Sequence, residues 1–442
     1  PDTFGFPAQI PQLMRHAGLK WFATNKLNWN QKNKVPWSTH HWEALDGSRV
    51  LAHVLTTPRD VQYLPFPTNY KSDLTAREVL GTTENSTIPA AVKDLPICYG
   101  YGDGGGGPTR ELLAKAVAFE GMPGMPRFKM STVRATFEAL ERASDTYQVW
   151  RGEHYMEGHR GVLTSQGWIK RANWLAERAL HEAEALSAMA GQSPDLSEAW
   201  KLVCLNQFHD IVTGTSISEV FADARRDYQR VDEIVSKVAR KAARTLASVQ
   251  PSVANTSPIA GPRVINGPDD APLYFERLEP YSITPLDSAS QPAVPVRAVH
   301  NGQHIVMENE HLLIELTETG QLSRVVEKAL MRNVLPEGAV GNQLQAFEDR
   351  PICWDAWDID PHIEDRSELV DGECQCEIIE TGPLRATVRV TTHWRSSHIT
   401  QDICLCAGSR RVDFATEVEW HEQHTLVKAA FPTSKRAASK EV

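Results

Sequence analysis

Three segments of the sequence combine carboxylates, histidine and glycine in ways that packing alone does not require. The first is Asp2-Thr3-Phe4-Gly5-Phe6, in which a carboxylate stands beside an aromatic ring and a glycine. An aspartate in this setting can attack an anomeric carbon or bind a metal ion, and the ring can cover the apolar face of a sugar. Taken alone, the segment is a weak signal and is more typical of an aspartate that only stabilises a turn.

The second segment is a glycine run around a single carboxylate. Five of the six residues from Gly102 to Gly107 are glycine, and the sixth is Asp103. Glycine loses much conformational entropy on folding, so a run of glycines is costly to order. Because glycine has no side chain, such a loop lets a ligand approach the backbone closely. A phosphate-binding loop would end in Gly-Lys-Ser/Thr, which is missing, and the flanking Tyr99 and Tyr101 argue against a flexible linker. We interpret the run as a functional loop in an ordered cleft.

The third segment runs from Asn206 to Thr215 and contains the pair His209-Asp210 between two predicted helices. A neutral imidazole is a common zinc ligand, and a neighbouring carboxylate can orient that ligand or bind a sugar hydroxyl. A histidine that is merely satisfied within a core is the alternative. The several polar residues gathered at this helix end weigh against that alternative.

The elements that must position these segments begin with an α/β region over residues 1–125. Short apolar runs alternate with helix-like stretches such as 10–17, which indicates a mostly parallel sheet. The predicted strands of this region cover residues 18–24, 47–55 and 95–100. We expect this region to carry the first two segments.

Residues 126–249 are predicted to be helical, because apolar residues recur there at intervals of three and four. Long helices of this kind pack as a three-helix bundle. The predicted helices cover residues 166–190, 197–208 and 218–249. The third segment, with its histidine, ends the second of these helices, so the helical region is expected to contribute to the site.

Residues 250–442 are predicted to form a β-sandwich, since proline, glycine and β-branched residues become frequent there. The clearest alternating runs cover residues 311–316, 384–392 and 412–420. Two pairs of cysteines, Cys374 with Cys376 and Cys404 with Cys406, have a spacing that places both thiols on one face of a strand. Packing is the expected role of these pairs, and a metal site is the alternative.

Composition excludes several classes of function. The chain of 442 residues is long enough for two or three domains, and its net charge of -10 argues against a nucleic-acid partner. No run of about 18 apolar residues occurs, so we expect no membrane span. The seven cysteines do not have the pattern of a disulfide framework.

Together the three segments resemble glycoside hydrolase family 38, in particular its cytosolic and bacterial branch. The resemblance extends from residue 1 to about residue 432. Beyond the glycine loop and the segment from Asn206 to Thr215, it rests on these motifs: Val149 to Glu153, Glu157 to Gly161, Glu308 to Glu310, Phe347 to Arg350, Trp354 to Asp360 and Trp420 to Thr425.

The resemblance implies a retaining exo-α-mannosidase that acts on terminal residues of α-mannoside oligosaccharides with the help of Zn²⁺. Asp2 matches the nucleophile, which is also a zinc ligand, and His209 matches another zinc ligand. Phe4 and Asp210 match positions that line the mannose subsite, and Asp103 is the candidate acid/base. The resemblance further implies a cytoplasmic protein with an α/β barrel-like catalytic domain, and homo-oligomers are common in the family.

One departure from the family pattern concerns the metal. The family has a His-x-Asp motif upstream of the segment that matches Asp2, and no histidine precedes Asp2 here. We therefore expect residues 1–442 to lack two of four zinc ligands and the first part of the catalytic barrel, and to be inactive alone. The alternative function is an inactive carbohydrate-binding or structural fragment of such an enzyme.

Overall fold

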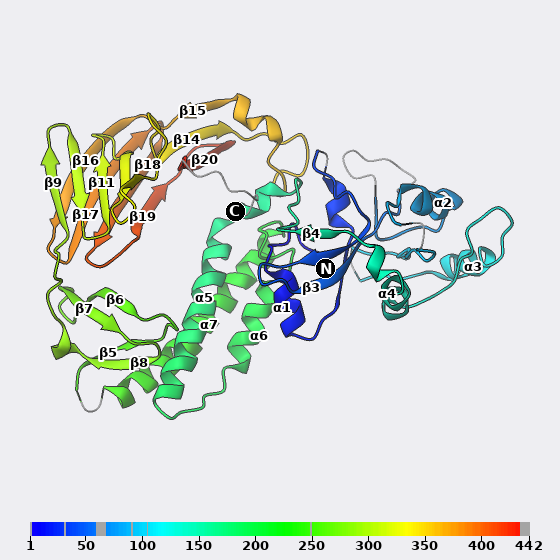
Figure 1. Cartoon of the computed structure of the whole chain (residues 1–442), viewed down its shortest axis with the longest axis horizontal. Coiled ribbons are helices and arrows are strands. Elements are labelled where there is room, and N and C mark those ends of the chain that lie inside the picture. Colours follow the sequence, from blue (N-terminus) through cyan, green and yellow to red (C-terminus); the bar gives the residue numbers. More distant parts are fainter. Residues whose placement is uncertain are drawn as a thin grey trace. The chain divides into compact units, whose positions relative to one another are not determined.

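The computed structural model describes residues 2–30, 32–58, 68–89, 92–103, 105–247 and 250–433. Its contacts divide the chain into two compact units, one built on Pro1–Arg160 and one on Gly161–Arg436 (Figure 1). The finer domain boundaries predicted near 125 and 249 stay predictions. Among the described residues, no helix combines the length and the apolar character needed to cross a membrane.

The first unit is built on a four-stranded sheet with the order β1-β3-β2-β4. Two of its pairings, β1 with β3 and β2 with β4, are parallel, and β2 with β3 is antiparallel, so the sheet is mixed. The strands are β1 (Trp21–Thr24), β2 (Thr39–Glu43), β3 (Arg49–Val54) and β4 (Val149–Arg151). The helices are α1 (Ile10–His16), α2 (Ala76–Asn85), α3 (Arg110–Ala118) and α4 (Val133–Glu141).

The structure confirms two of the three strands predicted in this unit, together with the helix that begins at Ile10. The strand predicted over residues 95–100 is wrong: this stretch forms no strand, and Tyr99 makes only an isolated parallel bridge with Ser72. Pro96 interrupts the run and has no N–H to donate to a ladder, which explains why a short apolar run failed to pair.

Apolar residues cover both faces of this sheet. Phe6, Phe22 and Trp42 pack on one face with ring centroids 4.8 and 5.0 Å apart between successive rings. Leu51, one residue out of phase with Val50 on β3, belongs to a second cluster on the other face. The period of two along a strand thus fixes the segment of Phe6 to one side of the sheet.

The second unit begins with the three long helices that the sequence predicts: α5 (Gly167–Met189), α6 (Ser197–Asn206) and α7 (Ser218–Leu246). They contribute to one apolar cluster that includes Leu180, Val203 and Val235. These residues recur on the face that each helix turns toward the others, as expected for an amphipathic helix.

The rest of the second unit is β-structure, and its largest apolar core lies between two sheets. Ile305, Met307 and Ile314 from the sheet β13-β12-β11-β10-β9 pack with Val388 and Ile403 from the sheet β16-β17-β18-β19. Two antiparallel sheets around one core agree with the predicted sandwich.

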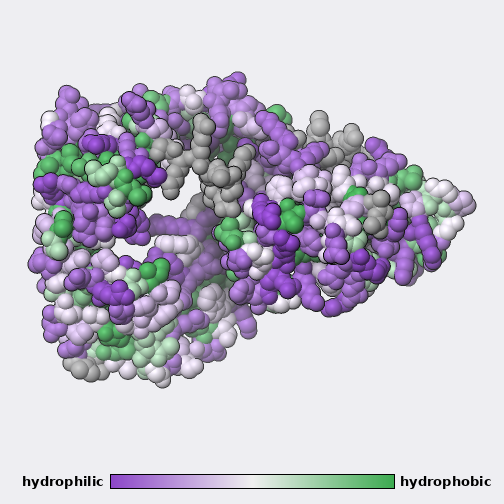
Figure 2. Space-filling model, viewed as in Figure 1, coloured by the Kyte–Doolittle hydropathy of each residue, from purple (hydrophilic) through white to green (hydrophobic). Residues whose placement is uncertain are grey.

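The strands of this region have the following bounds: β5 (Ser252–Asn255), β6 (Gly261–Asn266), β7 (Pro272–Leu278), β8 (Ser282–Pro285), β9 (Arg297–Asn301), β10 (His304–Glu308), β11 (Leu312–Leu316), β12 (Leu322–Glu327), β13 (Arg332–Asn333), β14 (Gln343–Glu348), β15 (Ser367–Leu369), β16 (Glu373–Thr381), β17 (Arg385–Trp394), β18 (Ser397–Cys406), β19 (Val412–Glu419) and β20 (Thr425–Ala430). On the face shown in Figure 2, hydrophilic residues predominate and hydrophobic ones form scattered patches.

Candidate functional site

The segment that carries Asp2 is fixed to the first unit by Phe6. The Phe6 side chain is buried, and its backbone exchanges two hydrogen bonds of 2.9 Å with the backbone of His154. Gly5, which lies between Asp2 and Phe6, has a φ of 123°, a backbone conformation that residues with a side chain rarely adopt. Asp2 therefore lies four residues from a firmly held point.

Asp2 forms an ion pair with a lysine that sequence reasoning missed. The Lys26 Nζ atom lies 2.9 Å from Asp2 Oδ1, and the Lys26 side chain is only 5% exposed. Three aromatic rings surround this ammonium group, with centroids 3.8 Å (Trp29), 5.2 Å (Tyr70) and 5.5 Å (Phe4) from Nζ. A cation over aromatic faces is held electrostatically, so Lys26 is a fixed positive charge beside the candidate nucleophile.

Asp103, in the glycine loop, is held by two neighbours that are far from it in sequence. Tyr70 donates its phenolic O–H to one carboxylate oxygen of Asp103, and the Lys71 ammonium donates to the other. Burial alone would raise the pKa of Asp103, but the hydrogen bonds from Lys71 and Tyr70 outweigh it and lower the pKa below its usual range. Asp103 is therefore ionised in this state.

The glycine run lets the loop fold tightly around Asp103. A Cβ atom on Gly106 would lie 2.8 Å from the Cβ atom of Tyr101, closer than real side chains approach. Asp103 itself has a φ of 49°, in the left-handed region that aspartate tolerates better than most residues. The described part of the loop is tightly folded, as expected for an ordered loop, but the Asp103 side chain is 55% exposed, and the function of the loop stays a prediction.

Tyr70 connects the two carboxylates. Its hydroxyl reaches Asp103 while its ring lies against Lys26, whose charge also acts on Asp103. Contacts through Lys26 and Tyr70 thus link Asp2, Phe4 and Asp103, and the roles predicted for these three residues stay predictions. The sequence signal for the missed residues was weak: Lys26 and Trp29 lie one turn apart in a short 3₁₀ helix (Lys26–Trp29).

Three buried histidines lie in or beside the sheet, with His40 and His154 on the face of Phe6 and His53 on the opposite face, which it shares with Leu51. His40 Nε2 and His154 Nε2 are 3.0 Å apart, and Thr39 Oγ1 lies 2.9 Å from His53 Nδ1. Burial lowers the pKa of His40 and of His53 to about 4 and that of His154 to about 2, with a further lowering from the neighbouring imidazole in each case. All three rings are therefore neutral in the folded protein near pH 7.

The His209-Asp210 pair belongs to the second unit, in the turns that follow α6. His209 Nε2 lies 3.6 Å from Asp210 Oδ2, and the His209 ring lies 4.4 Å from that of Phe208. The His209 side chain is 30% and the Asp210 side chain 47% exposed, and their predicted roles in zinc and sugar binding stay predictions.

The loop after this pair is pinned by Gly214. Its φ is 82°, and a Cβ atom there would lie 2.2 Å from the carbonyl oxygen of Ser165. Lys170 Nζ donates to the carbonyl oxygen of Thr213 at 2.8 Å and also to that of Ser165. The residues around His209 are thus held by close backbone contacts rather than by side chains alone.

The two zinc ligands that the family resemblance predicts, Asp2 and His209, lie in different units and are of donor types that suit a zinc ion. Carboxylate and imidazole are typical zinc ligands, and Asp2 and His209 supply one of each. Within the described ranges, no group of three or more His, Cys, Asp or Glu side chains is placed to hold a metal ion.

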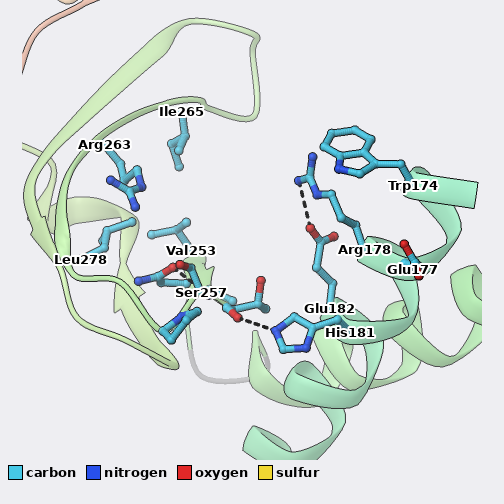
Figure 3. A pocket seen from close by; sticks show the side chains of 14 residues that line it. Trp174, Glu177, Arg178, His181, Glu182, Val253, Ser257, Arg263, Ile265 and Leu278 are labelled. Carbon is cyan, nitrogen blue, oxygen red and sulfur yellow. Dashed lines mark hydrogen bonds and ion pairs between the residues drawn. The ribbon is translucent and has the colours of Figure 1, made fainter. Parts of the chain in front are cut away.

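A cavity of about 600 Å³ lies in the second unit between α5 and strands β5 to β7 (Figure 3). Trp174, Arg178 and Glu182 project into it from α5, and Arg178 lies over the Trp174 ring at 4.6 Å. None of the predicted site residues lines this cavity.

Models of one enzyme family match most of the chain. The model described as Glycosyl hydrolases family 38 N-terminal domain matches residues 1–153, and the Alpha mannosidase middle domain matches residues 157–246. The Glycosyl hydrolases family 38 C-terminal domain matches residues 307–440.

Individual proteins of known name are similar to the chain over almost its whole length. The protein named Alpha-mannosidase 2C1 from Homo sapiens is 34% identical over 99% of this chain, and Alpha-mannosidase G from Dictyostelium discoideum is 31% identical over 97%. The chain spans less than half of these relatives, 44% and 45% of their lengths. The crystal structure of an alpha-mannosidase from Enterococcus faecalis V583 shares the fold, with a TM-score of 0.69 at 15% identity, over 98% of this chain and 62% of that one.

Proposed function

The chain belongs to glycoside hydrolase family 38, and from this premise we propose that the full-length protein is a retaining exo-α-mannosidase acting on α-mannoside oligosaccharides. The observation that carries the proposal is a set of contacts around Lys26 and Tyr70. Asp2 forms an ion pair with Lys26, Asp103 accepts a hydrogen bond from Tyr70, and the charge of Lys26 also acts on Asp103. Retaining glycosidases need two carboxyl groups about 5–5.5 Å apart, one as nucleophile and one as acid and base. Phe4, Trp29 and Tyr70 add rings that suit a sugar face.

In the proposed first step, a carboxylate oxygen of Asp2 forms a bond to the anomeric carbon while the bond from that carbon to the leaving oxygen breaks. Asp103 gives its proton to the leaving oxygen. In the second step Asp103 takes a proton from water, the water oxygen bonds to the anomeric carbon, and Asp2 leaves as a carboxylate. Lys26 orients the Asp2 carboxylate before the first step, because its ammonium group lies 2.9 Å from Asp2 Oδ1.

The resting state of Asp103 suits the second step better than the first. Its contacts with Lys71 and Tyr70 lower its pKa and favour the carboxylate, which is the form that a general base needs. The first step needs the protonated acid. We therefore expect a bound sugar to displace Lys71 from Asp103 and so raise the pKa of this carboxyl group.

We propose Zn²⁺ as the metal of the full-length enzyme, with Asp2 and His209 as two of its ligands. When bound, zinc would hold vicinal sugar hydroxyls and orient the ring. Phe4 and Asp210 are proposed to line the mannose subsite. The cytoplasm is the proposed compartment, and all seven cysteines are free thiols, which suits a reducing environment.

The experiment that tests this function follows the first product of the full-length protein by NMR. A retaining enzyme acting on an aryl α-mannoside releases α-mannose first, because two inversions restore the original configuration. β-Mannose as the first product would refute the retaining mechanism. Binding of mannosides without any turnover would favour the alternative of a carbohydrate-binding protein.

Replacing Asp103 by alanine tests its role as acid and base. The variant should lose roughly 10²–10⁴-fold in kcat/KM on an ordinary mannobiose, whose leaving oxygen needs a proton. On an activated aryl mannoside the loss in the first step should be much smaller, because that leaving group departs without protonation. Equal losses on both substrates, in steady-state assays of the full-length protein, would show that Asp103 is not the acid.

A further inference from the structure

The two Cys-x-Cys pairs of the β-region face opposite sides of one sheet. Cys374 and Cys376 on β16 pack against the core of the sandwich, as the packing interpretation predicts. On β18, Ile403 and Leu405 fill that core, so Cys404 and Cys406 point to the opposite face and are half-buried there. Identical spacing therefore produces one structural pair and one pair that the packing does not explain.

The outward pair has the geometry of a chelate. The Sγ atoms of Cys404 and Cys406 are 3.9 Å apart. Two thiolates bound at 2.3 Å to one tetrahedral zinc ion lie about 3.8 Å apart, so the sulfurs already stand at the separation that such an ion requires. Neighbouring thiols on a flat strand start from a wider spacing, and here the side chains lean toward each other.

The surroundings of the pair favour a thiolate at Cys404 and a thiol at Cys406, so the second proton leaves only when a cation binds. Thr387 and Asp413 lie directly opposite Cys404, on β17 and β19, and Arg385 lies opposite Cys406. The hydrogen bond with Cys406, together with Thr387 and the charge of Arg385, lowers the pKa of Cys404 against the raising effects of burial and Asp413. The same hydrogen bond and burial raise the pKa of Cys406. Glu380 binds Arg385 at 2.7 and 2.8 Å and balances its charge, so the site remains open to a cation.

We propose that Cys404 and Cys406 form a bidentate binding site for a thiophilic divalent cation with a filled d shell, such as zinc or cadmium. Two thiol protons leave as the cation binds, and both sulfurs become thiolate ligands. Among the described residues no third His, Cys, Asp or Glu stands in ligand position, so water completes the coordination and the ion exchanges readily. The proposal does not depend on the glycosidase function.

A disulfide between the same residues is the competing use of the pair, and the strand geometry disfavours it. Cα atoms two residues apart in a strand are about 6.6 Å apart, at the upper end of the range of about 4.4–6.8 Å that disulfides span. A disulfide would also require the two sulfur atoms to move much closer together than 3.9 Å, whereas a metal ion can bridge them at that distance.

The test is a titration of the reduced full-length protein with Cd²⁺, followed by the ultraviolet charge-transfer absorption that only cadmium–thiolate bonds produce. The proposed ligands of the glycosidase metal include no cysteine, so that site is silent in this measurement. We expect one equivalent of cadmium to develop the band. Cys404→Ser and Cys406→Ser should each weaken cadmium binding roughly tenfold or more, since each removes one of two soft ligands.

Two controls isolate the pair. A variant with serine at the exposed Cys98, Cys204 and Cys353 should keep the band, as should Cys376→Ala in the pair that faces the core. Urea unfolding verifies that each variant is folded. A band that survives in both Cys404→Ser and Cys406→Ser, a band lost only with the exposed cysteines, or no band at one equivalent in folded wild-type protein would overturn the proposal.

Discussion

Replacing Asp2 by asparagine is expected to lower kcat on an aryl α-mannoside by at least about 10³-fold while the protein remains folded. An amide has the shape of the carboxylate but does not attack an anomeric carbon, so the covalent step is lost. The amide oxygen can still accept a hydrogen bond from Lys26, and Phe6 still holds the segment through its backbone bonds to His154. Initial rates and the urea unfolding midpoint of the full-length protein measure the two expectations.

A matched substitution and a chemical rescue make this result specific. Asp46→Asn, which changes an exposed carboxylate in a turn of the same unit, should leave the rate unchanged. In Asp2→Ala, added azide should attack the open face of an activated α-mannoside and yield the β-mannosyl azide. Activity of Asp2→Asn within tenfold of the wild type, once deamidation back to aspartate is excluded, would remove Asp2 from the nucleophile role.

The buried histidines should make the first unit lose stability as the pH falls from about 6.5 toward 4. The unfolded chain binds protons on these rings near pH 6.5, whereas the folded rings of His40 and His53 stay neutral down to about 4 and that of His154 to about 2. The unfolded state therefore binds more protons in this window, and the free energy of unfolding decreases. Each ring contributes a loss on the order of 1–2 kcal/mol at pH 5.

Hydrogen exchange across β2, β3 and β4 at pH 7.5, 6 and 5 measures this loss where it occurs, after correction for the intrinsic dependence of exchange on pH. His16→Gln, which removes an exposed histidine of the same unit, is the matched control and should not alter the pH dependence. His154→Gln should flatten the dependence by about one proton, because one of the three rings no longer titrates. Equal protection of these strands at pH 7.5 and 5 would contradict the role assigned to the histidines.

The long helices could be predicted because their apolar residues recur regularly over many turns. The short strands could not all be predicted, because their formation depends on the strands and side chains with which they pair. The helices α5, α6 and α7 begin within a residue of the predicted starts because each shows many turns of an apolar face. The strand β2 was not predicted, since His40 and His41 look polar in sequence and become buried or half-buried only by bonding to residues such as His154 and Ser144. Such bonds cannot be inferred from local pattern.

The same limit explains the residues of the site that sequence reasoning missed. Asp2, Phe4 and Asp103 stand in unusual local contexts, and family resemblance supplied their expected roles. Tyr70 and Lys71, however, are 33 and 32 residues from their partner Asp103, and nothing adjacent in the sequence indicates that they bind it. Their contribution depends on a fold that brings distant loops together, which only the structure shows.

For protein engineering, the glycine loop is less uniform than its sequence. Gly106 has no room for a side chain beside Tyr101, yet a Cβ atom on Gly107 would meet no other atom within 4 Å, and its backbone lies outside the left-handed region. Alanine at Gly107 would restrict the unfolded chain without disturbing the folded loop, a gain of about 0.4–1 kcal/mol. A loop that seems to demand glycine throughout thus contains a position, four residues from the proposed acid and base Asp103, where rigidity could be added at no steric cost.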